Sequence, residues 1–399
     1  MSAASRKIGD CLSRAQAASV RSSWRWAVGP DKSQLQPKAI LFFVLSVEPR
    51  CGRLSEATAN DLISMTLVVG RIDGPRLAIA SDTLLTEHDK PLPFQSGVVK
   101  SCMLPGDICV SFSNSPVTAE RAFGEFMTTY PNGTRYAEVI SFFERSSRDT
   151  GNDYLVAFAH PAKVLKIADG RCSKSLSKTA WIGDQAAYDR FREYESRLRH
   201  RSEHGRALNV AYFADEMANS PASDLFSTMR NVVIDRTVPS AGGFVPVISN
   251  RDNGFRFSVY CDMLYDWPEA QPEEYNFAYT DKTSLQASGE NAGYSVAQIA
   301  PGFMGLNLVG FYFVKARKLF FFYGQGFGLA NRCHVFENVP PGSIHEALNN
   351  FMGMNFNWLL TVTTPRDGGP YRADVSGIKE PGSQLAFFVE ANTFPKPAD

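Results

Sequence analysis

The sequence predicts an α+β fold in which pairs of strands alternate with pairs of helices. The expected strands are short apolar runs bounded by turn residues, at 67–69, 77–80, 108–112, 154–160, 164–168, 179–182, 244–248 and 255–260. The expected helices have apolar residues at helical spacing, at 117–126, 136–148, 187–198, 213–217 and 225–234. Short turns join several neighbouring strands, which favours antiparallel pairing. We therefore expect mainly antiparallel sheets with helices packed against them.

The composition indicates a globular chain with a sizeable core. Of the 399 residues, 44% are apolar and 12% aromatic, which is enough for one large domain or two small ones. Lys and Arg number 41, as do Asp and Glu, so the charge gives no indication of a nucleic-acid partner or of an anionic membrane surface. The apolar run at 39–47 is too short to span a bilayer. We expect a folded part that binds neither nucleic acid nor membrane.

The cysteines favour a reducing compartment. There are seven of them, an odd number, and none form a CxxC pair. This pattern argues against a disulfide framework and against a structural zinc site. Together with the lack of a spanning segment, it predicts a cytoplasmic protein without a metal site.

Residues 1–64 differ from the rest of the chain. Up to Arg53 they contain nine Lys and Arg but only three Asp and Glu, and they are rich in Ser and Ala. They show no sustained helical or strand period. Three interpretations stay open: an extension from a start codon assigned too far upstream, a propeptide, and an organelle transit peptide. All three predict that the folded domain begins near Met65.

The stretch 65–100 combines residues that carry nucleophile chemistry. Thr66 opens the first expected strand, and Asp82 closes the second, sixteen residues later. Thr86 follows, and Lys100 lies thirty-four residues after Thr66. Considered alone, Asp82 is explained as an ordinary turn residue, and Lys100 is explained as an ordinary surface charge. In this order on a pair of strands, they indicate one site that contains a hydroxyl, a carboxylate and an ammonium group.

This block resembles the start of a proteasome-type N-terminal-nucleophile (Ntn) hydrolase, such as proteasome β-subunits and the bacterial two-component proteasome-like protease. In that family the chain begins with the catalytic Thr, an Asp ends the second strand, and a Lys follows at a spacing close to the one seen here. The resemblance implies a four-layer αββα sandwich with two packed, mainly antiparallel sheets over residues 65–261. It implies neither a metal nor an organic cofactor.

The resemblance also assigns roles to the motif residues. Thr66 is the nucleophile, and its own α-amino group is the base that a threonine hydroxyl needs. The unperturbed pKa of such an amine lies near 8. Lys100 keeps the amine neutral by like-charge repulsion, and Asp82 keeps Lys100 charged. Thr86 is expected to line the substrate cleft.

A threonine inside a chain has no α-amine, and residues 1–65 precede Thr66. Met65 is followed by a residue small enough for removal of an initiator methionine. We therefore expect the active chain to begin at Thr66, after removal of Met65 or of a propeptide.

Three further junctions match the family more loosely. Where the family has a glycine-rich junction whose main-chain amide forms the oxyanion hole, this chain has Ser113 and Asn114. Where the family has a Gly-Ser-Gly, the matching residue is Asp184, whose alternative role is a helix N-cap. Asp235 and Ser240 match the Asp and Ser that support the nucleophile's amine, or they belong to a plain glycine-rich turn.

The part beyond the resemblance, 262–399, carries no functional motif. Its first section, 262–295, is polar, with several Glu, Asp and Asn and two Pro, which predicts a long loop. Strands are expected at 308–314, 318–323 and 385–390, and a helix at 344–352. We expect this part either to add strands to the sandwich or to cover a substrate cleft.

The expected function is hydrolysis of amide (peptide) bonds, with a peptide or another amide as the substrate. Relatives assemble into rings, so a homo-oligomer ring is expected, while no ATPase partner is identified. Two alternatives belong to other classes. One is a small-molecule amidase or acyltransferase on the same fold. The other is a non-catalytic interaction subunit in which Thr66 stays buried behind residues 1–64.

Overall fold

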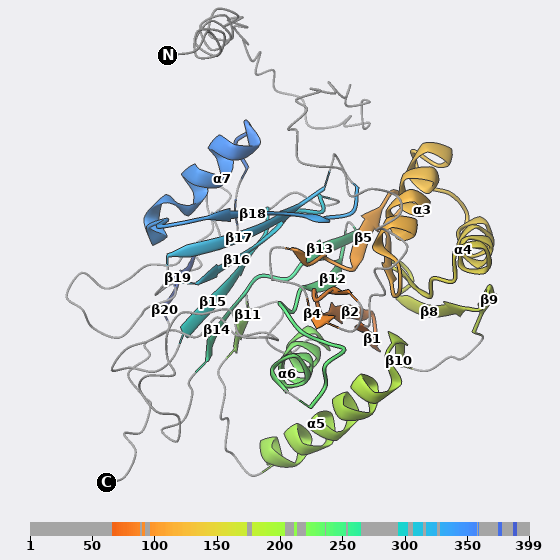
Figure 1. The fold of residues 1–399 in the computed structure, drawn as a ribbon, viewed down its shortest axis with the longest axis horizontal. Coiled ribbons are helices and arrows are strands. Elements are labelled where there is room, and N and C mark those ends of the chain that lie inside the picture. The colour runs from red at the N-terminus through yellow and green to blue at the C-terminus, as the bar shows by residue number, and fades with distance from the viewer. Residues whose placement is uncertain are drawn as a thin grey trace, which may run out of the picture. The chain divides into compact units, whose positions relative to one another are not determined.

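The computed structural model describes residues 66–87, 90–91, 96–173, 178–203, 211–213, 221–235, 237–252, 254–264, 294–301, 306–313, 317–324, 328–356, 358, 374–376 and 386–388. All of them belong to the second of two units into which the chain divides, Leu54–Asp399. Within these ranges the fold is α+β, with three large antiparallel sheets and five α-helices (Figure 1). Residues 1–64 lie outside the described ranges, so the three interpretations of that segment stay predictions.

The first sheet contains the motif strands. Its order is β10-β1-β2-β12-β13, and every neighbouring pair is antiparallel. The strands are β1 (Leu67–Asp73), β2 (Arg76–Ser81), β10 (Thr179–Gly183), β12 (Val247–Arg251) and β13 (Gly254–Phe257). β1 and β2 form the predicted hairpin around the turn at Gly74. Both faces of these two strands are buried, since alternate residues enter two different apolar clusters.

The second sheet packs against the first. Its order is β5-β6-β7-β8-β9, again antiparallel throughout. The strands are β5 (Ser101–Leu104), β6 (Ile108–Phe112), β7 (Tyr154–Phe158), β8 (Lys163–Ala168) and β9 (Arg171–Cys172). The two sheets come so close at Gly70 that a Cβ there would lie 2.8 Å from Leu155 and 2.9 Å from Val164. A residue without a side chain is therefore required at this point of β1.

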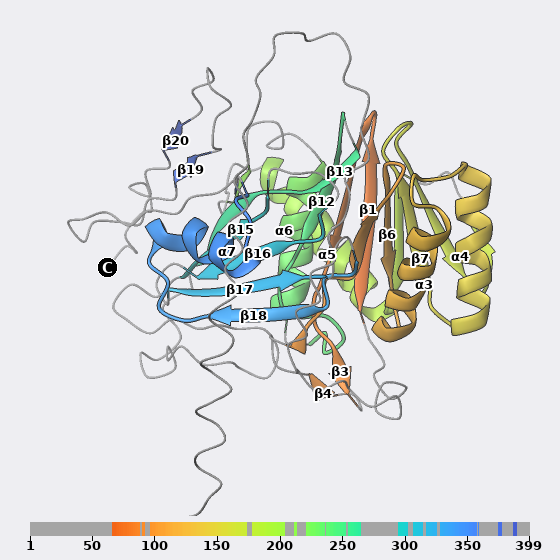
Figure 2. The same cartoon turned by 90° about the horizontal axis from the view of Figure 1, so that it is seen from above.

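Helices cover the two outer faces of these sheets. The helices α5 (Gln185–Glu203) and α6 (Pro221–Ile234) pack on the first sheet, where Phe191 and Met229 lie against β1 and β2. The helices α3 (Pro116–Thr129) and α4 (Tyr136–Thr150) pack on the second sheet through a cluster of aromatic rings. Figure 2 shows β1 between α5 and α6 on one side and β6, β7, α3 and α4 on the other.

The third sheet has six antiparallel strands in the order β11-β14-β15-β16-β17-β18. The strands are β11 (Ala211–Phe213), β14 (Tyr260–Leu264), β15 (Tyr294–Ile299), β16 (Val309–Phe313), β17 (Lys318–Tyr323) and β18 (Arg332–Phe336). The helix α7 (Ile344–Met352) packs on one face of it through Ile344 and Leu348. Two strand pairs are small: β3 (Thr86–Glu87) with β4 (Lys90–Pro91), and β19 (Asp374–Ser376) with β20 (Ala386–Phe388).

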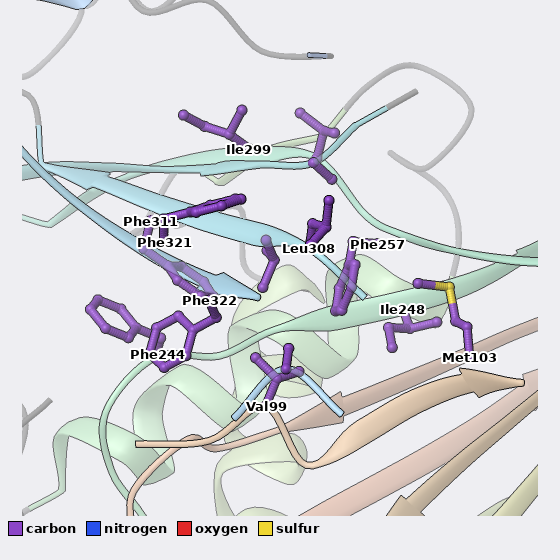
Figure 3. Close-up of a cluster of buried hydrophobic side chains, with 14 of the residues drawn as sticks. Val99, Met103, Phe244, Ile248, Phe257, Ile299, Leu308, Phe311, Phe321 and Phe322 are labelled. Carbon is purple, nitrogen blue, oxygen red and sulfur yellow. The ribbon is translucent and has the colours of Figure 1, made fainter. Parts of the chain in front are cut away.

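One apolar cluster joins the third sheet to the space between the other two. It contains Val68 and Ile79 of the first sheet, Leu155 of the second, and Phe311 and Phe320 of the third. Figure 3 shows part of this cluster, with side chains of the third sheet on one side and Met103 and Ile248 on the other. The C-terminal part and the motif strands therefore share a core.

Several expected elements differ from the structure. Of the helix expected at 213–217, Phe213 ends strand β11, which pairs with β14, and residues 214–217 lie outside the described ranges. The strand expected at 244–248 begins only at Val247, after Pro246, which lacks the N–H that a sheet pairing uses. The loop expected at 262–295 begins and ends in strands β14 and β15. β14 pairs with β11 and β15, which both lie far from it in sequence, so no local turn signal predicts this strand.

Candidate functional site

Thr66, Asp82 and Lys100 come together in a fully buried cluster. The Thr66 hydroxyl donates a hydrogen bond to Asp82 Oδ1 at 2.5 Å. The Lys100 ammonium donates to the same oxygen at 2.9 Å and forms an ion pair with it. All three residues are 0% exposed. The Thr66 hydroxyl and the Lys100 ammonium thus bind the same oxygen of Asp82, although the three residues lie far apart in sequence.

The strand topology explains this convergence. β1 and β2 are antiparallel, with Val68 opposite Ser81, so the start of β1 and the end of β2 lie at the same edge of the first sheet. Thr66 directly precedes β1, and Asp82 directly follows β2. Lys100 directly precedes β5 of the second sheet. The cluster therefore lies where chain segments of two packed sheets meet.

Five donors surround the Asp82 carboxylate. Besides Thr66 and Lys100, Oδ1 accepts from the Leu67 main-chain amide at 3.1 Å. Oδ2 accepts from the amides of Leu84 and Gly242, each at 3.2 Å. An ionised carboxylate accepts hydrogen bonds at both oxygens and donates none, so this arrangement suits its charged form.

Lys100 is a cation held inside the protein. Burial lowers the pKa of its ammonium group, and the charge and hydrogen bond of Asp82 oppose that effect only in part. A second acceptor, the Leu84 carbonyl, lies 2.6 Å from Nζ. A buried ammonium group with a lowered pKa and a paired carboxylate is found more often at functional sites than elsewhere.

Asp184 contacts Thr66 through its main chain. Its amide donates to the Thr66 carbonyl at 2.8 Å, while its carboxylate accepts from the Ala186 amide at 3.0 Å and thereby caps the start of α5. The preceding Gly183 has a φ of +105°, and a Cβ there would lie 2.0 Å from the Thr66 carbonyl oxygen. This glycine lets β10 and α5 approach the nucleophile candidate.

Ser240 and Asp235 lie on the chain that leads from α6 to β12. Ser240 is 0% exposed, and its hydroxyl has no hydrogen-bond partner in the described part of the chain. The Asp235 carboxylate accepts from Arg190 Nε at 2.6 Å and from the Tyr194 hydroxyl at 2.8 Å, and it also bonds to Thr237. These contacts join α5 to the C-terminal end of α6.

The structure also defines the ionisation of Asp235. Burial raises the pKa of this carboxyl, but the hydrogen bonds from Arg190, Thr237 and Tyr194 together outweigh it and hold the pKa well below its usual range. Asp235 is thus the partner of a cation on α5, in an environment different from that of Asp82.

The residues expected to bind substrate have distinct environments. Thr86 is buried in the short strand β3. The Ser113 amide donates to the Asp153 carbonyl at 3.0 Å, so it is already engaged, while its buried hydroxyl has no partner within the described ranges. Asn114 is exposed, has a φ of +76°, and donates from Nδ2 to the Gly151 carbonyl at 2.7 Å.

Sequence reasoning missed several residues of the site. The amides of Leu84 and Gly242 bind Asp82, and the Thr83 hydroxyl accepts from the Phe244 amide at 2.8 Å. A Cβ at Gly243 would lie 2.4 Å from the Thr83 hydroxyl oxygen. The glycine pair at 242–243 was a visible signal of a tight turn, but its target, 160 residues away in sequence, was not.

The likeness of this chain to known proteins is found among solved structures. No protein-family model matches the chain. No curated protein matches it either. Among solved structures, the chain is similar to Thiobacillus denitrificans BPH in complex with epoxomicin, at 14% sequence identity and a TM-score of 0.34. The match covers 46% of this chain and 97% of that chain.

Proposed function

We propose that the protein is a threonine-type Ntn hydrolase that cleaves amide bonds with Thr66 as its N-terminal nucleophile. The observation that carries this proposal is the buried contact of the Thr66 hydroxyl with Asp82, whose other hydrogen bonds include the Lys100 ammonium. Thr66, Asp82 and Lys100, three of the residues that the family resemblance selects, meet at one oxygen of the Asp82 carboxylate.

The arrangement of helices and sheets supports the same proposal for the fold. Two five-stranded antiparallel sheets pack face to face, and a pair of helices covers the outer face of each. We assign this part to the four-layer αββα sandwich of Ntn hydrolases. In this assignment Thr66 directly precedes β1, which lies between β10 and β2 in the first sheet, and it meets Lys100 at the Asp82 carboxylate.

The proposed reaction uses Thr66 as both nucleophile and base. Its α-amine takes the proton of the hydroxyl while Oγ1 forms a bond to the carbonyl carbon of the substrate amide. The carbon–nitrogen bond then breaks, and the proton passes from the α-amine to the leaving amine. Water hydrolyses the resulting ester by the reverse proton transfers and restores the hydroxyl. Lys100 lowers the pKa of the α-amine by like-charge repulsion, so that more of it is neutral near pH 7.

The oxyanion requires at least one free main-chain donor. The Ser113 amide is bonded to Asp153, which leaves the amide of Asn114 as our proposal for this role. The left-handed conformation of Asn114 turns the chain at the strand-to-helix junction, where the family resemblance places the oxyanion hole.

This mechanism requires a free α-amine at residue 66. We propose that the active chain begins at Thr66, after removal of Met65 or of a propeptide, and that residues 1–64 are not part of the folded domain. A peptide or another amide is the proposed substrate, and assembly into a homo-oligomer ring in the cytoplasm stays a proposal on the same basis. In the described part of the chain, no helix has both the length and the apolar character needed to cross a bilayer.

One observation favours a second candidate, a non-catalytic subunit with an Ntn-type fold. Thr66 is 0% exposed, so no substrate reaches its hydroxyl in this arrangement of the chain. In that case the cluster of Thr66, Asp82 and Lys100 serves only to join the two sheets. The two candidates differ in whether Thr66 ever becomes an accessible N-terminus.

Turnover by matched variants tests the proposal. A peptide library and a panel of small amides would be offered to the chain beginning at Thr66 and to its Thr66→Ser and Thr66→Ala variants. We expect Thr66→Ser to keep measurable hydrolysis, because it keeps a hydroxyl on an N-terminal residue. Thr66→Ala should lose several orders of magnitude in kcat. Equal turnover by Thr66→Ala and the parent chain would overturn the proposal, and preference for one class of amide would separate a protease from an amidase.

A further inference from the structure

The strands of the third sheet and the chain segments beside them contact the candidate site at three points. The first contact is made to the turn that presents the Gly242 amide to Asp82, the second to the residue before Lys100, and the third to strand β5, which follows Lys100. Sequence reasoning gave residues 262–399 no function, and the strands β15 to β18 belong to that part.

The first contact is aromatic. The Phe244 ring stacks on Phe311 of β16, with centroids 4.4 Å apart and an interplanar angle of 10°, and it also packs against Phe320 and Phe322 of β17. Figure 3 shows Phe244 beside Phe322 at this face of the sheet. The Phe244 amide in turn donates to the Thr83 hydroxyl. The third sheet therefore fixes the turn at 242–244 against the segment that carries Asp82.

The second contact is made by the chain between β17 and β18. The Ala330 carbonyl accepts from the amide of Val99, the neighbour of Lys100, at 3.1 Å. Next to Ala330, the Asn331 side chain donates to Glu120 on α3 at 2.5 Å. The segment between β17 and β18 is thus bonded both to helix α3 and to Val99, the residue before Lys100.

A third contact secures the strand that Lys100 leads into. Asn307 is 0% exposed, and its side-chain carbonyl accepts from the Met103 amide of β5 at 2.9 Å. Its side-chain amide donates to the Met103 carbonyl at 3.3 Å. The Asn307 side chain thereby forms the hydrogen bonds that a neighbouring strand would form with this residue of β5.

We propose that the third sheet is a built-in support of the candidate site, which sets the positions of Lys100 and of the Gly242 amide around Asp82. This inference rests on the proposed function. Phe244, Phe311 and Asn307 are positioning residues in it, because they act through Lys100 and Gly242 and not on the substrate. A displacement of catalytic groups by about 1 Å can lower a rate about 100-fold, so such a support changes kcat.

Two buried phenylalanines of the third sheet form a matched pair for the test. Phe311 faces Phe244, whereas Phe321 packs on Phe351 and Trp358 at the opposite face of the sheet. Both are 0% exposed, so Phe311→Leu and Phe321→Leu remove similar buried surface. The chain beginning at Thr66 and both variants would be compared by amide hydrogen exchange and by the pH dependence of kcat and KM.

We expect Phe311→Leu to speed exchange at the amides of Val99 and Gly242 about tenfold or more, while Phe321→Leu leaves both within about twofold of the parent. Phe311→Leu should lower kcat at least about tenfold with little change in KM. If Phe311 only stabilises the fold, both variants should lower the melting temperature by similar amounts, and hydrogen exchange and kcat should not differ between them. The inference would be overturned if Phe311→Leu and Phe321→Leu showed the same exchange rates at the amides of Val99 and Gly242.

The outcomes also separate this inference from the proposed function. If no Thr66-dependent turnover exists in the parent chain, the proposed function fails, and hydrogen exchange still decides whether the third sheet holds the Asp82 cluster. If Phe311→Leu does not fold, Asn307→Leu replaces it, since it removes both hydrogen bonds to Met103 with little change in side-chain volume. Unchanged exchange at Val99 in Asn307→Leu would then overturn the inference.

Discussion

Asp82 and Asp235 are both carboxylates that the family resemblance assigned to the site, yet their environments differ. Asp82 is 0% exposed and paired with an ammonium group that is also 0% exposed. The Asp235 side chain is paired with Arg190, whose side chain is 30% exposed. The Asp82 pair is also bonded to a hydroxyl on Thr66, whereas the Asp235 pair joins two helices. Both carboxylates form an ion pair, so the ion pair alone does not identify the candidate site. The complete burial of the Asp82 pair and its contact with Thr66 distinguish it from the Asp235 pair.

The largest expected difference between the two carboxylates is in stability. Asp82→Asn leaves the Lys100 ammonium buried without its counter-charge, and breaking such a pair costs about 3–5 kcal/mol. Asp235→Asn should cost less, because water can solvate the Arg190 guanidinium. Urea unfolding of both variants at pH 7 measures the difference. Equal losses would show that the burial of the Asp82 pair has no special energetic weight.

A glycine pair tests how tightly the buried cluster is enclosed. Gly183→Ala places a Cβ against the Thr66 carbonyl, whereas a Cβ at Gly74 meets nothing within 4 Å. Both glycines have positive φ, so Gly74→Ala reports the backbone strain alone. We expect about 1 kcal/mol for Gly74→Ala and roughly 3 kcal/mol for Gly183→Ala. If thermal unfolding shows equal losses, the contact at Thr66 is not tight.

The pH dependence of turnover tests the electrostatic role of Lys100. The α-amine must be neutral to accept a proton, so kcat/KM rises as pH passes the pKa of the amine. A nearby cation lowers that pKa, and Lys100→Met therefore moves the acidic limb to higher pH, by about one unit. Arg190→Met is the control at the Asp235 pair and should leave the limb in place. An unmoved limb in Lys100→Met would contradict the assigned role.

The smallest expected effect concerns the Asp235 pair in acid. The folded-state pKa of this carboxyl lies well below its usual value near 3.9, so the charged group stabilises the fold fully above that value, and the contribution is lost progressively as pH falls from there toward the folded-state pKa. The difference in melting temperature between the parent and Asp235→Asn should thus be largest at pH 7 and shrink steadily as pH falls below about 4. A difference that persists unchanged at pH 3 would assign the effect to packing.

The hairpin that carries Thr66 and Asp82 was predictable because its contacts are local. The turn at Gly74 and the two apolar runs specify the pairing of β1 with β2, and that pairing brings the two residues to one edge. Lys100 belongs to another sheet, and only the family spacing pointed to it. The role of its neighbours, such as the Ala330 carbonyl that binds Val99, had no signal in the sequence.

The rest of the site depends on contacts between distant segments. A Gly-Gly pair predicts a turn, but no property of the sequence says that the Gly242 amide binds Asp82. For the same reason the sequence predicts a loop at 262–295, although its first residues belong to β14 and its last to β15, which pair with each other from distant positions in the sequence. The Asp184 side chain bonds to the Ala186 amide at the start of α5, while the contact of its own amide with the Thr66 carbonyl had no signal in the sequence.

The most direct test of the central claim is the N-terminus of the native protein. The chain would be isolated from its own source, its intact mass and N-terminal sequence determined, and its reaction with a threonine-directed electrophile mapped by mass spectrometry. We predict a chain that begins at Thr66 and carries one adduct on that residue, with no adduct in Thr66→Ala. A native chain that still carries residues 1–65 and forms no adduct at Thr66 would contradict the hydrolase mechanism and leave the non-catalytic subunit as the better account.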